Sequence, residues 1–352
     1  MNIILKNAVG CADCAFLPEC GGLPEKSSLF DGCYSECMDN CNPESCHLTC
    51  PNNQRLYVNR IAEIGGSFDF TSPALKVPAI KLPPYVTKIH NGSGREKNLR
   101  LGVAVIPIRE LLRKSGANIS CRFADASQVR RCFRLPAQAA FVISCISVDG
   151  DVEMAWRGLM YGGLSKELAK LKPAAIIVPN FSFFIEDVPR IHTLYNRKRI
   201  CMAARMLSEA GCRIIAPLNA NTAHDWDFWY KLLQENPAMK YVAKEFQTGL
   251  SAPAAAKAAI ESLAKVQERL GRPLHPVALG AFEFRDILSA HFKHYTIVDS
   301  RPFMLAVNRR RTRRTSDGSY EDVFTPTAQD ESIDEILQSN IRVRQKRLKQ
   351  CE

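Results

Sequence analysis

The segments Ala140-Phe-Val-Ile-Ser-Cys-Ile-Ser-Val148, Ala174-Ala-Ile-Ile-Val178 and Arg213-Ile-Ile-Ala216 decide the fold class of this chain. Each is a short and nearly continuous apolar run, and a longer stretch of helical character follows each one. Such runs are typical of strands buried on both faces, as in a parallel sheet that helices cover. The repeated unit therefore predicts an α/β fold.

The same alternation of strands and helices extends in both directions along the chain. Further strands are predicted at Tyr85–His90, Leu101–Ile106, Tyr241–Phe246, Pro276–Ala281 and Tyr295–Val298. Helices fit between most of the strands, at Glu153–Leu171 with an interruption at Gly162–Gly163, His192–Ala210, Asp225–Gln234, Ala252–Leu270 and Phe284–Phe292. Because eight strands of this kind follow one another, the sequence predicts a (β/α)8 barrel of the TIM type.

Composition divides the 352 residues into four parts. Residues 1–55 are rich in cysteine, residues 56–308 hold the predicted barrel, residues 309–330 are predicted to form a basic and polar linker, and residues 331–352 a C-terminal helix. The formal charge is −4 over residues 1–55, +13 over the barrel and +2 over the remainder. A basic domain of this size favours nucleic acid, DNA or tRNA, as a partner, because clustered Lys and Arg side chains bind phosphates.

The apolar segments of the sequence are too short to span a membrane. The first residues, Met1–Gly10, have neither the apolar length nor the small-residue cleavage site of a signal peptide. We therefore expect a cytoplasmic protein with no membrane partner.

The C-terminal part has strong helix signals. Ser332 and Glu335 form a capping box, and acidic residues in the first turn and basic residues in the last complement the helix dipole. One face is apolar and consists of Ile333, Ile336, Leu337 and Ile341. This face needs a covering surface, which is the barrel, a second copy of the chain in a homodimer, or a partner protein.

Eight of the 14 cysteines lie close together near the N-terminus. They are Cys11, Cys14, Cys20, Cys33, Cys37, Cys41, Cys46 and Cys50. A segment this short builds no core of its own, and thiolates at these spacings suit two tetrahedral zinc sites. Four-cysteine ligation serves an iron–sulfur cluster equally well. Disulfides are a third interpretation. Cys33 and Cys37, and likewise Cys46 and Cys50, are four residues apart, a spacing that suits a helical hairpin held by disulfides.

Polar side chains follow the predicted strands at the end where TIM barrels carry their chemistry. The set consists of Asp149, Asp151, Asn180, Asn219, Glu245, Asp299 and Arg301. Carboxylates and amides of this kind suit the recognition of a base or a sugar. A run of arginines just beyond the last strand is suited to binding nucleic-acid phosphates. It consists of Arg309, Arg310, Arg311, Arg313 and Arg314.

Two stretches near the end of the barrel resemble a known family. Arg272-Pro-Leu-His-Pro-Val-Ala-Leu-Gly-Ala-Phe-Glu-Phe-Arg-Asp-Ile-Leu288 and Tyr295-Thr-Ile-Val-Asp-Ser-Arg301 are similar to the last two βα units of tRNA-guanine transglycosylases and their DNA-modifying phage and bacterial relatives. The resemblance covers roughly residues 140–310 and lies in layout more than in identity. The central stretch that begins at Pro179 is similar to an uncharacterised bacterial and phage family with a P-[ND]-F-S…D-x-P signature.

The resemblance implies roles for two aspartates. Asp299 stands where that family carries its nucleophile, and Asp149 stands near an aspartate that reads the guanine-like base. Base exchange also needs an acid/base group, for which Asp149, Asp151 and Glu245 are candidates. The sequence departs from the family at two points. Pro107 and the residues after it replace the loop that carries the family's second aspartate, and the family's C-terminal zinc ligands are absent.

Three functions follow as hypotheses. The first is a transglycosylase that exchanges guanine for a 7-deazaguanine-type base in DNA or RNA, with Asp299 as its nucleophile. The second is a catalytically inactive barrel that binds nucleic acid or a protein partner in a mobile-element or defence system. The third is an iron–sulfur oxidoreductase built on the cysteine segment.

Metal analysis of the purified chain tests the interpretation of the cysteines. Two zinc sites predict a colourless protein with about two zinc ions per chain, because each tetrahedral site takes four thiolates. The measurement is elemental analysis together with a visible absorption spectrum. Visible thiolate-to-iron bands with stoichiometric iron would contradict zinc and support the cluster.

Overall fold

The computed structural model describes residues 47–49, 54–71, 74–78, 81–91, 94–183, 190–248, 250–327 and 332–349. All eight clustered cysteines lie outside these ranges, so the metal sites assigned to them stay a prediction. Among the described helices, none is long and apolar enough to cross a membrane.

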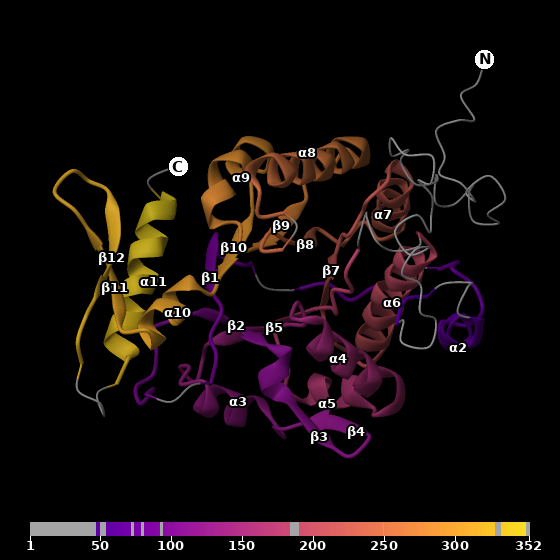
Figure 1. Ribbon diagram of the computed structural model, residues 1–352, viewed down its shortest axis with the longest axis horizontal. Helices are drawn as coiled ribbons and strands as arrows, with labels where there is room; N and C mark the ends of the chain where they lie inside the picture. The colour runs from indigo at the N-terminus through magenta and orange to yellow at the C-terminus, as the bar shows by residue number, and fades with distance from the viewer. Residues whose placement is uncertain are drawn as a thin grey trace, which may run out of the picture.

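Eight parallel strands form the centre of the molecule (Figure 1). They are β1 (Tyr85–Thr87), β2 (Val103–Pro107), β5 (Ala140–Ser144), β6 (Ala175–Ile177), β7 (Ile214–Pro217), β8 (Tyr241–Glu245), β9 (His275–Leu279) and β10 (Thr296–Asp299). Their order in the sheet is β1-β10-β9-β8-β7-β6-β5-β2. A parallel bridge between Lys88 and Val105, with the Ile89 amide 2.8 Å from the Val105 oxygen, brings the two edge strands together. The predicted TIM-type barrel is confirmed, and each strand overlaps its predicted range.

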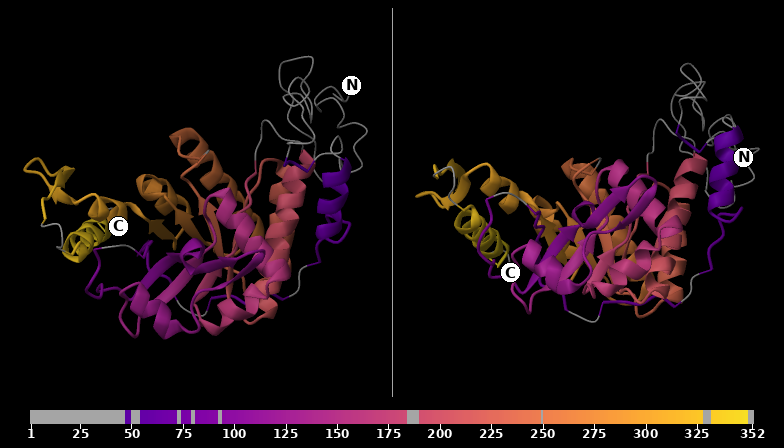
Figure 2. Two further views of the ribbon diagram at one scale, coloured as in Figure 1. Left: turned by 60° about the horizontal axis from the view of Figure 1, so that its bottom comes forward. Right: turned by 90° about the horizontal axis from the view of Figure 1, so that it is seen from below.

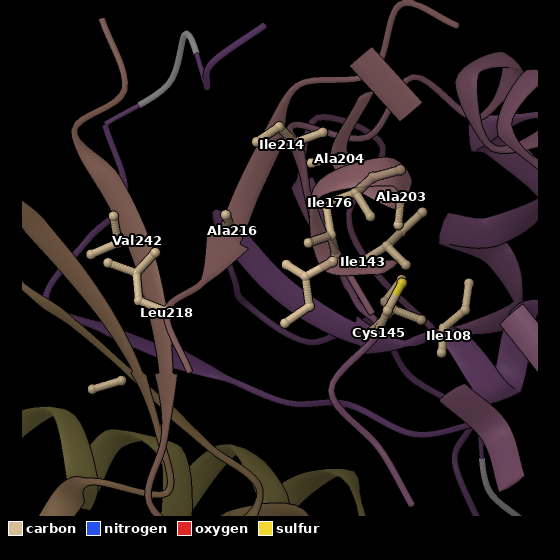
Figure 3. Packing of buried hydrophobic residues seen from close by; sticks show 14 of the residues in the cluster. Ile108, Ile143, Cys145, Ile176, Ala203, Ala204, Ile214, Ala216, Leu218 and Val242 are labelled. Carbon is tan, nitrogen blue, oxygen red and sulfur yellow. The ribbon is translucent and has the colours of Figure 1, made fainter. Parts of the chain in front are cut away.

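The two faces of the strands bury different cores. One cluster holds side chains from all eight strands and none from a helix, for example Val86, Val142, Ala243 and Val298, so it fills the barrel interior. The other packs the opposite strand faces against the helices. Figure 3 shows this outer layer, where Ala203 and Ala204 lie against neighbouring strands. Because side chains alternate along a strand, the assignment of one residue fixes the direction of the next.

The helices cover the outside of the barrel (Figures 1 and 2). They are α2 (Gln54–Glu63), α3 (Ala126–Cys132), α4 (Asp149–Tyr161), α5 (Leu164–Lys170), α6 (Arg190–Glu209), α7 (Ala223–Glu235), α8 (Pro253–Leu270), α9 (Arg285–His291), α10 (Arg301–Val307) and α11 (Asp334–Lys349). The break between α4 and α5 falls at the predicted glycines. A Cβ atom at Gly162 would lie 2.5 Å from the Ile119 oxygen, and Gly163 has a φ of +67°.

Two antiparallel hairpins are added to the barrel. The first, β3 (Leu112–Ser115) with β4 (Asn118–Cys121), follows β2. The second, β11 (Arg310–Arg314) with β12 (Tyr320–Phe324), lies in the range predicted to be a linker. A tight turn explains this difference, because the Asp317 carboxylate accepts a hydrogen bond from the Ser319 amide at 3.1 Å and Gly318 has a φ of +86°.

Helix α11 packs against α10, β11 and the end of β1 (Figure 1). Its apolar stripe is buried in the same core as the barrel helices, so of the three covering surfaces that we considered, the chain itself provides the one that is used. The buried Asn340 joins the helix to the hairpin. Its Oδ1 accepts the Thr312 amide at 2.9 Å, and its Nδ2 donates to the Arg310 oxygen at 2.9 Å.

The first turn of α11 is fixed by one carboxylate. Asp334 pairs with the buried Arg95 at 3.0 Å and accepts the backbone amides of Glu96 and Lys97 at 2.7 and 2.8 Å. Burial opposes ionisation of Asp334, but hydrogen bonds from Ser332 and from these amides outweigh it and hold the pKa of Asp334 below its usual value. The carboxylate therefore stabilises the fold in its ionised form.

We expect Asp334→Ala to lower the free energy of unfolding by about 3 kcal/mol, because it leaves Arg95 buried without its carboxylate. The measurement is denaturant unfolding at several pH values. The stabilisation is present above the pKa of an unfolded aspartate and fades as the pH falls through the lowered pKa. The matched control is Glu335→Ala, whose side chain is 78% exposed. Equal losses in both variants would contradict this role of Asp334.

Candidate active site in the barrel mouth

Side chains alternate in direction along each strand, and this alternation decides which strand-end residues face the inside of the barrel. Val86 and Ala243 point inward. Lys88 and Glu245, each two positions further along, therefore project into the mouth at the carboxyl ends of β1 and β8. Both side chains are partly exposed. Lys88 was not among the residues that the sequence indicated as functional.

The Lys88 amine contacts the loop that follows β5. Its Nζ donates a hydrogen bond to the Ile146 oxygen at 3.4 Å. Burial lowers the pKa of Lys88, while the negative charges of Glu245 and Asp151 act in the opposite direction. The charges of two of the predicted residues therefore contribute to the electrostatic environment of this amine.

Asp151 and Asp149 occupy the first turn of α4, directly after the loop that follows β5. The Ser147 hydroxyl donates to Asp151 Oδ2 at 2.6 Å, and the Ser182 hydroxyl donates to Asp149 Oδ1 at 3.0 Å. A helix N-terminus stabilises negative charge. Asp151 is only 8% exposed, and its negative charge acts to raise the pKa of Lys88. Asp149 instead contacts Ser182 in the loop after β6.

The remaining mouth residues have structural partners. Glu245 accepts hydrogen bonds from the Thr248 amide at 3.1 Å and from its hydroxyl at 3.2 Å. The Asn219 amide donates to Asn180 Oδ1 at 2.6 Å and to the Phe181 oxygen at 3.0 Å. The two asparagines predicted to bind substrate therefore hold together the loops that follow β6 and β7.

The structure places Asp299 away from the mouth. Ile297 packs in the outer layer and Val298 in the interior, so Asp299 faces outward again. Its Oδ2 lies 2.9 Å from Arg344 Nε of α11, and both side chains are 7% exposed. The Tyr85 hydroxyl donates to the same oxygen at 3.3 Å. The expected nucleophile is thus held in a buried ion pair that fastens α11 to the barrel.

Neighbouring contacts strengthen this anchor. The Arg344 guanidinium lies 3.7 Å from the centre of the Phe282 ring and 3.3 Å from Glu283 Oε1. Burial raises the pKa of Tyr85, and the negative charge of Asp299 raises it further. Arg301, predicted to bind substrate, pairs with Asp322 of the hairpin at 2.5 Å.

The predicted phosphate-binding arginines lie in and beside strand β11. Arg310, Arg313 and Arg314 are exposed, whereas Arg309 and Arg311 are partly buried. Arg313 stands opposite Glu321 of β12. The hairpin therefore presents three exposed guanidinium groups at the end of the molecule away from α2 (Figure 1).

A second polar cluster is buried along α6. Asp225 accepts charged hydrogen bonds from Arg190 at 2.5 Å and from Arg197 at 3.0 Å. Arg199 binds Glu153 at 2.8 Å and stacks 3.8 Å from the centre of the Phe181 ring. A hollow lies beside this cluster and shares Arg197 with it. It is lined by Phe68, Asp69, Phe70, Arg197, His224, Asp227, Phe228 and Lys231.

The fold and the mouth together define a (β/α)8 barrel with the Lys88 amine and the Glu245 carboxylate at the carboxyl ends of two strands and Asp151 in the first turn of α4. Neither a family model nor a curated protein matches the chain. In solved structures it is similar to a provisionally named fructose-1,6-biphosphate aldolase from Coccidioides immitis, with a TM-score of 0.41 and 12% identity over 85% of this chain and 96% of that one. It is also similar to an HpcH/HpaI aldolase from Desulfitobacterium hafniense, with a TM-score of 0.27 and 10% identity over 66% and 90%. Likenesses this low carry no argument about activity, so the class rests on the strand order and pairing.

A double-mutant cycle tests the position of Asp299. We expect Asp299→Asn and Arg344→Met each to destabilise the fold, with a coupling energy of about 1–3 kcal/mol, because the two groups form one buried pair. The measurement is denaturant unfolding of the single and double variants. Additive effects of the two substitutions would show that the pair does not form.

Proposed function

We propose that this chain is an enzyme whose reaction takes place in the barrel mouth, and that it exchanges guanine for a 7-deazaguanine-type base in a nucleic acid. The observation that supports this most is that Glu245 projects into the mouth beside Lys88, and that the negative charges of Glu245 and Asp151 both act on the Lys88 amine. Base exchange at a glycosidic carbon requires two such groups, one as nucleophile and one as acid and base. The nucleophile is therefore a mouth carboxylate and not Asp299, which the sequence had indicated.

In this reaction one mouth carboxylate attacks the anomeric carbon, so that a carbon–oxygen bond forms while the carbon–nitrogen bond to guanine breaks. The other carboxyl group gives its proton to the departing base. The incoming base then returns a proton to that group and displaces the carboxylate, which restores the enzyme. Lys88 supplies positive charge beside the carboxylates and orients the sugar hydroxyls.

Charge favours a nucleic acid as the substrate. The barrel range carries a formal charge of +13 within a net charge of +11 for the chain, and strand β11 adds three exposed arginines. The target nucleotide would leave its stack and enter the mouth, as bases do in other enzymes that modify them. Zinc in the cysteine segment is part of the same proposal as a structural metal and takes no part in these steps.

The second candidate function is a catalytically inactive barrel that binds nucleic acid or a protein. One specific observation favours it: the aspartate in the position of the family's nucleophile is committed to Arg344. The two candidates differ in whether the mouth carboxylates matter for turnover or only the surface arginines matter for binding.

Incorporation of isotope-labelled guanine, and separately of a 7-deazaguanine base, into mixed tRNA and duplex DNA tests the proposal. We expect incorporation by the wild type and a loss of at least about 100-fold in Asp151→Asn and Glu245→Gln, because each removes a carboxylate that the reaction needs. Whichever of the two substitutions removes the nucleophile should also abolish the covalent protein–nucleic acid adduct, which denaturing gels detect.

Two controls sharpen this experiment. Asp299→Asn, assayed at a temperature where it is folded, should retain most of the activity, because its carboxylate faces α11. Asp286→Asn replaces an exposed carboxylate on α9 and should change nothing. No incorporation by metal-replete wild type, while the nucleic acid is still bound in a filter assay, would contradict the enzyme and favour the inactive barrel.

A further inference from the structure

The barrel holds two lysines that burial affects, and their side chains point to opposite faces of the strands. Lys244 points to the outer layer, donates to the Leu218 oxygen at 3.1 Å and lies 5.8 Å from the centre of the Trp226 ring. It is only 7% exposed, and burial lowers its pKa to about 8. Lys88 points into the mouth and is partly exposed. A molecule that enters the mouth therefore meets one amine and not the other.

The contacts of Lys88 suit a nucleophile. Its hydrogen bond goes to a backbone carbonyl, the Ile146 oxygen, and a carbonyl accepts from a neutral amine as well as from an ammonium group. None of the ion pairs among the described residues involves Lys88, although the charges of Glu245 and Asp151 act on its amine. The amine is therefore not committed to a salt bridge, and it has two bases in its neighbourhood.

We infer that Lys88 forms an imine with a neutral, hydroxylated aldehyde or ketone, such as the open-chain form of a sugar, bound in the barrel mouth. Two carboxylates disfavour an anionic ligand in this site and accept hydrogen bonds from hydroxyl groups. The inference does not depend on base exchange, because it needs neither a nucleobase nor a glycosidic bond.

The step balances without a further reagent. The Nζ lone pair attacks the carbonyl carbon, a carbon–nitrogen bond forms, and the carbonyl oxygen takes a proton from the amine through a mouth carboxylate. The resulting carbinolamine loses its hydroxyl group as water, with a second proton from the same nitrogen, and the imine remains. Asp151 and Glu245 carry these protons as general acid and base.

Reductive trapping with site mapping tests this inference on the full-length protein. The protein is incubated with 2-deoxyribose and cyanoborohydride, which reduces an imine to a stable amine, and peptides are mapped by mass spectrometry. We expect Lys88 to be labelled at least about tenfold faster than Lys97, which is 68% exposed, because a desolvated amine beside a base is an activated nucleophile. Lys244 should stay unlabelled.

Variants separate chemistry from folding. Lys88→Arg should lose the adduct, Lys244→Arg should keep it, and Glu245→Gln should slow labelling at Lys88 while leaving labelling at Lys97 unchanged. Circular dichroism checks that each variant is folded. Labelling of Lys88 at the rate of Lys97, or preferential labelling of Lys244, would overturn the inference.

A second arm identifies the source of the carbonyl group. A DNA duplex with one abasic site presents the same deoxyribose aldehyde within a nucleic acid. Faster trapping of the duplex than of free 2-deoxyribose would assign the site to a sugar in DNA, and the reverse would assign it to a free sugar. Trapping together with no base incorporation would support the imine and contradict base exchange. Incorporation without trapping would support base exchange and contradict the imine.

Discussion

The alternation of side chains along the eight barrel strands is the constraint on which the rest of the structure depends. Every second residue fills the barrel interior and the others bind the helix layer. At the carboxyl ends the same rule sends Lys88 and Glu245 into the mouth and Asp299 outward. A shift of one residue in β10 would turn Asp299 toward the interior. Which strand-end residues face the mouth thus follows from strand register more than from the presence of an aspartate at a strand end.

The outward direction of Asp299 gives the C-terminal helix its role. Its pair with Arg344 fixes the middle of α11, Asp334 fixes the first turn to residues 95–97, and Asn340 joins the helix to the arginine hairpin. These polar contacts lie beside a buried apolar stripe. The polar contacts fix the position of α11, and the burial of the stripe stabilises it there. The appended helix and hairpin therefore belong to the same folded unit as the barrel, and the exposed arginines of β11 are held in fixed positions relative to it.

The sequence predicted the barrel well, because strands buried on both faces read as apolar runs whatever surrounds them. It predicted Asp151 and Glu245 as mouth residues from their place after strands. It did not predict the direction of Asp299, since its partner Arg344 is 45 residues further along and only packing brings them together. Lys88 lay inside a predicted strand. Its position two residues after the inward-pointing Val86 was the signal that could have identified it as a mouth residue. The arginine-rich strand β11 has no apolar pattern, so only its Asp317-Gly318 turn indicated a hairpin.

The central claim is that ligands react in the barrel mouth and that Asp299 serves the fold. A crystal structure of the protein soaked with guanine or trapped with 2-deoxyribose tests it most directly. The account predicts electron density among Lys88, Asp151 and Glu245, with Arg344 still paired to Asp299. Density beside Asp299 with α11 displaced, and an empty mouth, would contradict it.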